Sequence, residues 1–371
     1  MIRFIHTADW QIGMKAAGLG SVSQDVRDAR LESVQGIVDL GHERGVKLLL
    51  VAGDVFEDNA VDRSLVREIG EKLRKFRGEV FIIPGNHDPL KPGSVWDHEV
   101  WGGSGNVTVI QEAKPIELDN CTLFPSPVKK KYSTQNPVSW IQAKNCDKIA
   151  IGLAHGSVNL PDSDYYPIPA NAAEQAGLDY LGIGHLHSYK PYKDSKGAIR
   201  MAYSGTHETT KFGESDSGKV LLVEIADRGA APKLEPIAIG KLKWITLNRD
   251  IKDPDELKRI IKDLDSIESP DDTLVRLRLE GFLSFSSQSD LIKSLEEILS
   301  THFLYGELSN ELSPAPKDNR WIDELPRGPV QKAARTIRKQ ALSGADEREK
   351  KVATRALLEL FELNNKEKAN S

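Results

Sequence analysis

Four short apolar runs in the first half of the chain each end in polar, chemically reactive residues. The runs are RFIHTAD at residues 3–9, KLLLVAGD at 47–54, EVFIIPGNHD at 79–88 and KIAIGLAHG at 148–156. A continuous apolar run of this length, bounded by turn residues, is typical of a buried strand. We therefore predict four buried strands, each followed by a loop that carries polar side chains.

Helical periodicity lies between these runs. Apolar residues recur at helical spacing over residues 23–43 and again over residues 62–76. Strands that alternate with helices indicate a layered α/β architecture. Because ligands of such folds gather beyond the carboxyl ends of the strands, the polar residues are expected to converge on one edge of the sheet.

The pattern changes after about residue 225. Strands are predicted at residues 241–248, 273–279 and 303–312, and helices at residues 254–264 and 289–300. These elements indicate a second, smaller α/β domain. The expected organisation is a first domain over 1–225, the small domain over 240–315, a proline-rich linker over 316–329 and a helical tail over 330–371.

The tail has two amphipathic stripes. The first contains Val330, Ala334, Ile337 and Ala341, and the second contains Val352, Ala356, Leu360 and Leu363. Ser343 and Gly344 separate them. Residues at this spacing share one face of a helix, so a helical hairpin is predicted.

Composition is that of an ordinary globular protein, with 39% hydrophobic and 28% charged residues. No apolar run is long enough to span a membrane, and the first residues lack the regions of a signal peptide. We therefore expect a cytoplasmic location and no membrane partner. Cys121 and Cys146 form no CxxC motif and are expected to be reduced thiols.

The net charge of −5 argues against a protein coated with basic residues, although it permits a local basic patch. Lys129, Lys130 and Lys131 are consecutive, and residues 327–339 contain five basic residues and no acidic one. A solvated surface is the simpler interpretation of each cluster.

Four motif pieces carry the candidate chemistry. They are Asp9 in HTADWQIG, Asp54 in AGDVF, the GNHD segment, and the histidines of AHG and GHLH at positions 155, 185 and 187. Singly, an aspartate after a strand is usually a turn residue and a buried histidine usually belongs to the core. All of these residues, however, stand at the ends of predicted strands that would converge on one edge of the sheet.

The residue types suit phosphodiester hydrolysis. Two divalent cations roughly 3.5–4 Å apart neutralise the phosphate, activate water and stabilise the leaving oxygen. Asp54 is the candidate bridge between them. Carboxylate, amide and imidazole donors suit Mn²⁺, with Zn²⁺ or Fe²⁺ as alternatives.

With these motifs, roughly the first 210 residues resemble the calcineurin-like metallophosphoesterases, whose pattern is D-x-H, GD, GNHD, H and GHxH. HTADW, VAGDVF, GNHDP and YSGTHETTKFGE from Tyr203 are similar to the SbcD-type nuclease subunits of double-strand-break repair. The resemblance implies a layered α/β metallophosphoesterase sandwich with a small α/β capping domain. It also implies that the tail docks on an SbcC-like coiled-coil ATPase.

Carried over by position, the resemblance implies a set of metal ligands and two catalytic residues. His87 would contact the phosphate and act as an acid for the leaving oxygen, and Asp88 would orient it. The implied metal ligands are Asp9, Gln11, Asp54, Asn86, His155, His185 and His187.

Three positions depart from the family pattern. Gln11 replaces a histidine, which predicts a weaker first metal site, because an amide is a poorer ligand for transition metals than imidazole. Glu57 stands where SbcD-like enzymes commonly have histidine and would repel phosphate unless it holds metal or water. His207 stands where the family usually has proline. Both Glu57 and His207 are candidate substrate contacts.

The resemblance leads us to expect a metal-dependent DNA exonuclease or endonuclease, dimeric and coupled to an ATPase. One alternative is a phosphodiesterase or phosphatase for a small ester, which would not need the second domain and tail. Another is a weakly active metal-binding scaffold for the ATPase, in which Gln11 and Glu57 reflect decay.

Overall fold

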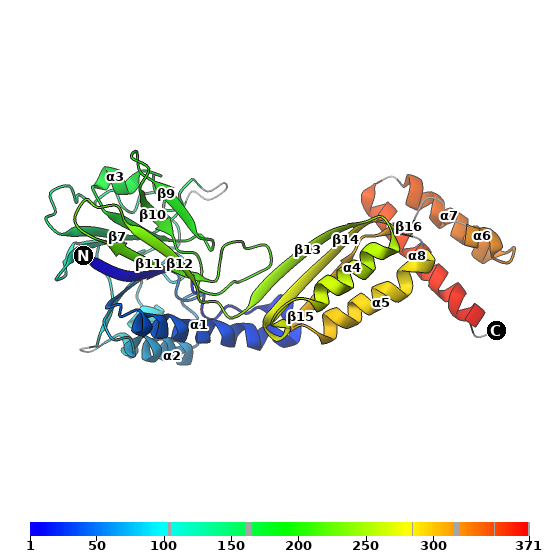
Figure 1. Cartoon of the computed structure of the whole chain (residues 1–371), viewed down its shortest axis with the longest axis horizontal. Coiled ribbons are helices and arrows are strands. Elements are labelled where there is room, and N and C mark those ends of the chain that lie inside the picture. Colours follow the sequence, from blue (N-terminus) through cyan, green and yellow to red (C-terminus); the bar gives the residue numbers. More distant parts are fainter. Residues whose placement is uncertain (103–104, 160–164, 284, 315–319, 345, 370–371) are drawn as a thin grey trace. The chain divides into compact units, whose positions relative to one another are not determined.

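The computed structural model describes residues 1–102, 105–159, 165–283, 285–314, 320–344 and 346–369 (Figure 1). They form two units, Met1–Lys243 and Trp244–Ser371.

The first sheet of unit one has the strand order β12-β11-β1-β2-β3-β4. Strands β1 to β4 run parallel to one another, whereas β11 pairs antiparallel with β1 and β12 pairs antiparallel with β11. The strands are β1 (Ile2–Thr7), β2 (Leu48–Ala52), β3 (Glu79–Ile83), β4 (Val107–Val109), β11 (Lys219–Ile225) and β12 (Lys233–Ala238).

The second sheet has the order β5-β6-β7-β8-β10-β9, with four parallel central strands and an antiparallel strand at each edge. The strands are β5 (Ile116–Glu117), β6 (Cys121–Pro125), β7 (Ile149–His155), β8 (Tyr180–Gly184), β9 (Lys190–Lys193) and β10 (Ile199–Tyr203).

Hydrophobic contacts stack these elements into helix, sheet, sheet and helix layers. One core joins the first sheet to α1 (Ser23–Glu43) and α2 (Arg63–Arg74). A second core lies between the two sheets, and a third joins the second sheet to α3 (Ala172–Ala176). Alternate residues of β2 show the reason: Leu49 faces the helices, while Leu48 and Leu50 face the other sheet. The predicted layered α/β fold is therefore confirmed.

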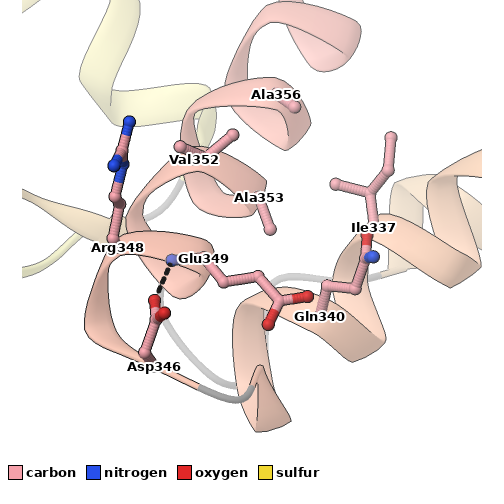
Figure 2. Close-up of a pocket in the computed structure, with 8 residues that line it drawn as sticks. All are labelled: Ile337, Gln340, Asp346, Arg348, Glu349, Val352, Ala353 and Ala356. Carbon is pink, nitrogen blue, oxygen red and sulfur yellow. Dashed lines mark hydrogen bonds between the residues drawn. The ribbon is translucent and has the colours of Figure 1, made fainter.

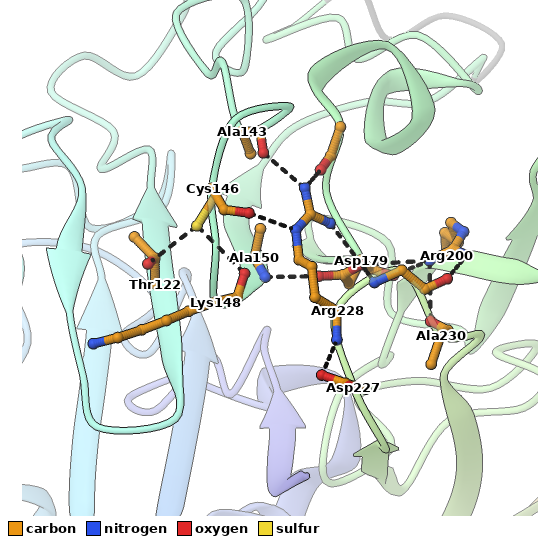
Figure 3. Close-up of polar contacts among 12 residues, drawn as sticks. Thr122, Ala143, Cys146, Lys148, Ala150, Asp179, Arg200, Asp227, Arg228 and Ala230 are labelled. Atoms are coloured by element: carbon orange, nitrogen blue, oxygen red, sulfur yellow. Dashed lines mark hydrogen bonds and ion pairs between the residues drawn. The ribbon is translucent and has the colours of Figure 1, made fainter.

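A polar network ties loops together where β7 and β8 begin. The buried Asp179 carboxylate accepts from the main-chain N–H groups of Ala150 and Gly229 and from the Arg228 guanidinium, at 2.7–2.8 Å (Figure 3). Arg228 also donates to three carbonyl groups, one of them that of Cys146, and Cys146 is a free thiol. The network fixes the strand starts, at the opposite end from the polar motifs.

Unit two contains an α/β element and a helical part. Its sheet has the order β13-β14-β15, with β16 also paired to β14, and a separate core joins the sheet to α4 and α5. The elements are β13 (Lys243–Ile251), α4 (Pro254–Asp265), β14 (Thr273–Leu283), α5 (Phe285–Thr301), β15 (Tyr305–Asn310) and β16 (Ser313–Pro314). All five elements predicted between residues 241 and 312 are present, with shifted ends.

The helical part has α6 (Arg320–Glu324), α7 (Pro329–Ser343) and α8 (Glu347–Ala369). A small core is formed by Trp321, Ile322, Leu325, Ala334, Leu357 and Phe361. Helix α6 occupies part of the expected linker, whose residues 316–319 lie outside the described part. The buried face of α8 includes Leu357 and Phe361, and Leu360 of the predicted stripe packs against the same core, whereas Val352 is 64% exposed. An open pocket of about 350 Å³ lies between α7 and α8, beside Val352 (Figure 2).

Four short 3-10 helices complete the described elements. They are η1 (Ala17–Val22), η2 (Val95–Asp97), η3 (Glu99–Trp101) and η4 (Pro270–Asp272). Trp96 of η2 and Trp101 of η3 pack against Phe56. Among the described residues, none of the helices combines the length and apolar character that crossing a membrane requires.

Candidate metal centre

Side chains from both sheets of unit one meet in a buried cluster. One ligand atom from each of Asp54, His155 and His185 lies within 4.8 Å of the other two. The Asn86 Oδ1 atom lies 2.8 Å from His155 Nε2 and 2.9 Å from His185 Nδ1. The structure thus gathers the side chains of Asp54, Asn86, His155 and His185, four of the seven predicted metal ligands, in one cluster.

The topology explains this convergence. Asp54 and Asn86 follow β2 and β3 of the first sheet, whereas His155 ends β7 and His185 follows β8 of the second. All four strands are parallel to their sheet neighbours, so their carboxyl ends deliver these residues to one edge of the sandwich.

The loops at this edge hold strained backbone. Asp9, Gln11, Asp54 and His185 all have positive φ angles, of 56°, 47°, 52° and 116°. Such conformations cost free energy and recur at functional sites. Gly85 allows the close approach, because a Cβ atom there would lie 2.1 Å from Asp54 Oδ1.

Main-chain and carboxylate partners fix the imidazole rings. His155 Nδ1 lies 2.9 Å from the Ala52 carbonyl oxygen, which can only accept, so Nδ1 carries a proton and Nε2 faces Asn86. His187 Nδ1 lies 2.8 Å from Glu214 Oε1, which leaves Nε2 of His187 for a ligand. An outer partner of this kind commonly orients a metal-binding histidine.

Asp9 and Gln11 border the cluster through hydrogen bonds. Both Asp9 carboxylate oxygens accept from the His185 main-chain N–H, at 2.9 and 3.0 Å. The Gln11 side-chain amide donates to Asp54 Oδ2 at 3.3 Å. The main-chain N–H groups of Asp9 and Gln11 donate to the carbonyls of Gly53 and Asp54, which holds the two loops together.

Burial and mutual charge perturb these groups strongly. Burial raises the pKa of Asp9 to about 6, and burial together with the Asp54 charge raises the pKa of Asp88 to about 7. For Asp54, burial opposes ionisation, yet the charge and hydrogen bond of His155 hold its pKa below the usual range. Burial also opposes a charged His155, but Asp54 raises its pKa to about 9.

The donor set fits a divalent cation. Two carboxylates of the predicted ligand set, those of Asp9 and Asp54, are at most 2% exposed, and buried negative charges require compensation. His155 Nε2 and His185 Nδ1 both face the Asn86 Oδ1 atom, and a ring nitrogen that donates to this oxygen carries a proton. A cation bound among these atoms would replace such protons, as metal binding generally does. Mixed oxygen and nitrogen donors suit first-row divalent metals.

His87 lies beside the cluster with one ring nitrogen already fixed. Its main-chain N–H donates to Asp54 Oδ1 at 2.8 Å, and its Nδ1 lies 2.9 Å from the Glu57 carbonyl. Nδ1 is therefore protonated, and Nε2 is the nitrogen left for a substrate. The ring is partly buried, so this position suits the predicted phosphate contact.

Asp88 differs from its predicted role. Its Oδ1 accepts from the Gly85 N–H at 2.7 Å and its Oδ2 from the Phe56 N–H at 3.0 Å. The carboxylate is fully buried, and the His87 ring is bonded to Glu57 instead. Asp88 joins the AGDVF and GNHD loops and does not orient His87.

The two candidate substrate contacts are placed differently. His207 is fully buried, with Nε2 2.9 Å from the Arg30 carbonyl and its ring 5.5 Å from the Trp10 ring, so the structure does not present it to a substrate. Glu57 is partly buried, and its main chain, rather than its carboxylate, makes the contact with His87. A substrate contact of the Glu57 carboxylate stays a prediction.

Sequence reasoning missed two charged residues that support the centre. Arg30 is buried and donates to the carbonyls of Trp10 and Glu208, which ties α1 to the loops after β1 and β10. Glu214 holds His187 and also accepts from the Thr210 N–H at 2.7 Å. Glu214 belongs to the KFGE segment, which carried part of the family resemblance without a role.

Comparison with known proteins gives a family and one curated relative. The model of the calcineurin-like phosphoesterases matches residues 2–189, more than half of the chain. The chain is 22% identical over 244 residues to the uncharacterized metallophosphoesterase YhaO of Bacillus subtilis (strain 168). That match covers 61% of this chain and 58% of the length of YhaO.

Solved structures resemble the chain only distantly. TT1561 of Thermus thermophilus has a TM-score of 0.40 at 11% identity, covering 64% of this chain and 99% of that one. GAP50 of Plasmodium has a TM-score of 0.43 at 8% identity, covering 64% and 84%. The purple acid phosphatase PPD1 of yellow lupin has a TM-score of 0.40 at 10% identity, covering 61% and 50%.

The family match spans β1 to β8 and every residue of the buried cluster. The buried cluster and the layered fold agree with this match. The chain therefore belongs to the calcineurin-like phosphoesterase family.

Proposed function

We propose that this protein is a metal-dependent DNA nuclease that cleaves phosphodiester bonds by a two-metal mechanism with Mn²⁺. The observation that carries the proposal is the buried meeting of Asp54, Asn86, His155 and His185 at the carboxyl ends of four strands. The resemblance of HTADW and of the segment from Tyr203 to Glu214 to SbcD-type subunits supports DNA as the substrate.

The bound cations would supply phosphate neutralisation and activation of the attacking water. The protein itself supplies the metal ligands and the general acid. Asp54 is the proposed bridging ligand, since its two oxygens face different neighbours: Oδ1 faces the His87 N–H, and Oδ2 faces Gln11 and His155. Asp9, Gln11 and His187 are proposed for the first metal, and Asn86, His155 and His185 for the second.

His87 is proposed to hold the phosphate and to protonate the leaving oxygen through Nε2. The fixed Nδ1–H donation to Glu57 sets the ring tautomer, and the N–H donation to Asp54 keeps the residue beside the metal ligands. General acid catalysis needs this positioning within hydrogen-bond reach of the proton acceptor.

The test is incubation of the purified protein with Mn²⁺ and labelled single-stranded, blunt duplex and hairpin DNA, beside bis-p-nitrophenyl phosphate. Metal-dependent cleavage of DNA supports the nuclease. Cleavage of the small ester alone would favour the second candidate, a phosphodiesterase or phosphatase for small substrates, which the same metal ligands would serve equally well. Cleavage of neither would favour a metal-binding scaffold.

We also propose that the protein acts in the cytoplasm as a homodimer and that α7 and α8 dock on a coiled-coil ATPase. Exposed apolar side chains on these helices support docking: Val330 is 51%, Leu342 64%, Val352 64% and Leu363 59% exposed. An exposed apolar stripe on a helix is stabilised by a partner surface.

Point substitutions test the docking better than truncation. A cut after Pro326 would divide the core that Trp321 and Ile322 share with Leu357 and Phe361. Leu342→Glu with Val352→Glu leaves that core intact and should abolish co-purification with the ATPase. Lys332→Glu on α7 is the control, because it makes the protein more negative, as the double variant does, without removing an apolar side chain. Unchanged co-purification of the double variant would exclude this face as the docking surface. The proposed homodimer is tested separately, by light scattering.

A further inference from the structure

An exposed pair of tyrosines stands on the same edge of the second sheet as the metal centre. Tyr132 is 56% and Tyr165 41% exposed, and their ring centroids lie 4.8 Å apart with 42° between the ring planes. Aromatic rings are usually buried more deeply, since each removes a large apolar area from water. Two tyrosine rings left open to solvent are therefore available for a ligand.

Three consecutive lysines precede the first tyrosine. Lys129, Lys130 and Lys131 are all exposed, and Lys131 Nζ lies 5.7 Å from the centroid of the Tyr132 ring. Within the described part of the chain, the ion pairs under 4.0 Å involve none of these three lysines. We call Lys129, Lys130, Lys131, Tyr132 and Tyr165 the tyrosine–lysine platform.

Hydrogen bonds of the buried residue Tyr166 join the two loops of the platform and fix their relative position. Tyr166, 9% exposed, donates from its hydroxyl to the Lys130 carbonyl at 2.7 Å, and its N–H donates to the Ser133 carbonyl at 2.7 Å. The loop after β6 is thereby fixed to the loop after β7, and the two tyrosine rings are held side by side.

The same loops run directly into the metal centre. The Ser157 N–H, two residues beyond His155, donates to the carbonyls of Tyr165 and Tyr166 at 3.1 Å. Val128, just before the lysines, donates to the Pro84 carbonyl and accepts from Leu90, on either side of the GNHD segment. The platform is therefore anchored to the segments that hold His155, Asn86 and His87.

We infer that the tyrosine–lysine platform binds unpaired nucleic acid and guides it to the metal centre. The inference rests on the proposed nuclease function and names a substrate subsite for it. Stacking of bases on aromatic rings beside a basic strip is the chemistry by which single strands bind without sequence preference. A chain with net charge −5 needs a local basic strip of this kind to attract phosphates.

Acidic residues also lie near the platform and oppose the attraction of its lysines for phosphates. The net attraction is therefore measured by a salt titration. Glu112 pairs with Lys114 at 2.8 Å, and Lys129 also lowers its pKa. Asp162 and Asp164 precede Tyr165 in the sequence, outside the described residues. Each phosphate contact that is neutralised contributes roughly 0.7 to the slope of log affinity against log salt for a single strand.

The test measures binding of a fluorescently labelled oligothymidine to the full chain by anisotropy, in a chelator so that no cleavage occurs. Tyr132→Ala with Tyr165→Ala should weaken binding on the order of 10- to 100-fold, as expected for lost stacking. Tyr132→Phe with Tyr165→Phe should retain it, since the ring rather than the hydroxyl binds. Changing the three lysines to alanine should lower the salt slope by about 2.

A matched control removes the same charge from other elements, with Lys233, Lys258 and Lys262 changed to alanine on β12 and α4. It should bind oligothymidine like the wild type. Equal binding by the tyrosine-to-alanine variant, or equal loss in the phenylalanine variant, would overturn the platform, as would a wild type that does not bind oligothymidine at low salt. Hydrolysis of bis-p-nitrophenyl phosphate with Mn²⁺ is scored separately and tests the proposed function alone.

Discussion

The Glu214 carboxylate lies 2.8 Å from Nδ1 of His187. Burial works against a charged His187, yet the Glu214 hydrogen bond and the Asp9 charge raise its pKa. Glu214 thus fixes the orientation of a proposed metal ligand from a segment 27 residues further along the chain.

Glu214→Gln should weaken Mn²⁺ binding about 10- to 100-fold, because loss of an outer partner leaves the imidazole poorly oriented and less basic. Calorimetric titration with Mn²⁺ measures the change. Glu235→Gln, on the exposed strand β12, is the control and should bind like the wild type. Undiminished affinity in Glu214→Gln would show that His187 does not depend on this carboxylate.

His87→Ala should lower turnover of bis-p-nitrophenyl phosphate on the order of 10²- to 10⁴-fold while Mn²⁺ binding is retained. The reason is that His87 contacts Asp54 and Glu57 through its own N–H groups and is assigned to the substrate rather than to the metal. His302→Ala serves as the control. Loss of one equivalent of bound metal in His87→Ala would contradict this role.

Gln11→His should tighten the first metal site and raise hydrolysis at limiting Mn²⁺. Gln11 is only 3% exposed and already contacts Asp54, so an imidazole there would reach the same centre. Imidazole binds transition metals more strongly than an amide oxygen does, and histidine tolerates the positive φ of 47° better than most residues. Metal titrations and rates that do not change would place Gln11 outside the ligand set.

Much of the arrangement of strands and metal-site loops can be predicted from the sequence, because buried parallel strands appear as continuous apolar runs. Those runs located β1, β2, β3 and β7, and hence the loops with Asp9, Asp54 and Asn86. Hydrogen bonds between residues that are distant in sequence leave no such pattern of apolar residues. The role of Asp88 depends on N–H groups of two separate loops, and the burial of His207 depends on Arg30 of α1. Strands β4 to β6 and β8 to β12 were not predicted, although β11 pairs directly with β1.

Acid should destabilise the fold through His6. This fully buried residue has Nδ1 2.9 Å from the Tyr180 hydroxyl, and burial lowers its pKa to about 3. Between pH 6.5 and about 3 the unfolded chain binds a proton that the folded chain excludes, so stability rises with pH across this window. From pH 6.5 to pH 5 the loss is about 2 kcal/mol.

Urea unfolding at pH 7 and pH 5 measures this loss. His6→Asn removes the titrating ring and keeps a polar group near the position of Nδ1. The difference in unfolding free energy between the two pH values should shrink by about 2 kcal/mol in the variant, whatever its stability at pH 7. An unchanged difference would mean that His6 is not the group that titrates.

We expect the buried cluster around Asp54 to be a metal-dependent phosphoesterase centre. The most direct test of this expectation is the rate of bis-p-nitrophenyl phosphate hydrolysis by chelator-stripped protein during titration with Mn²⁺, for the wild type, Asp54→Asn and the surface control Asp216→Asn. The wild type and Asp216→Asn should be inactive without metal and gain a saturable rate with Mn²⁺, whereas Asp54→Asn should stay inactive throughout. Hydrolysis that persists in chelator, or an Asp54→Asn curve that matches the wild type, would contradict this expectation.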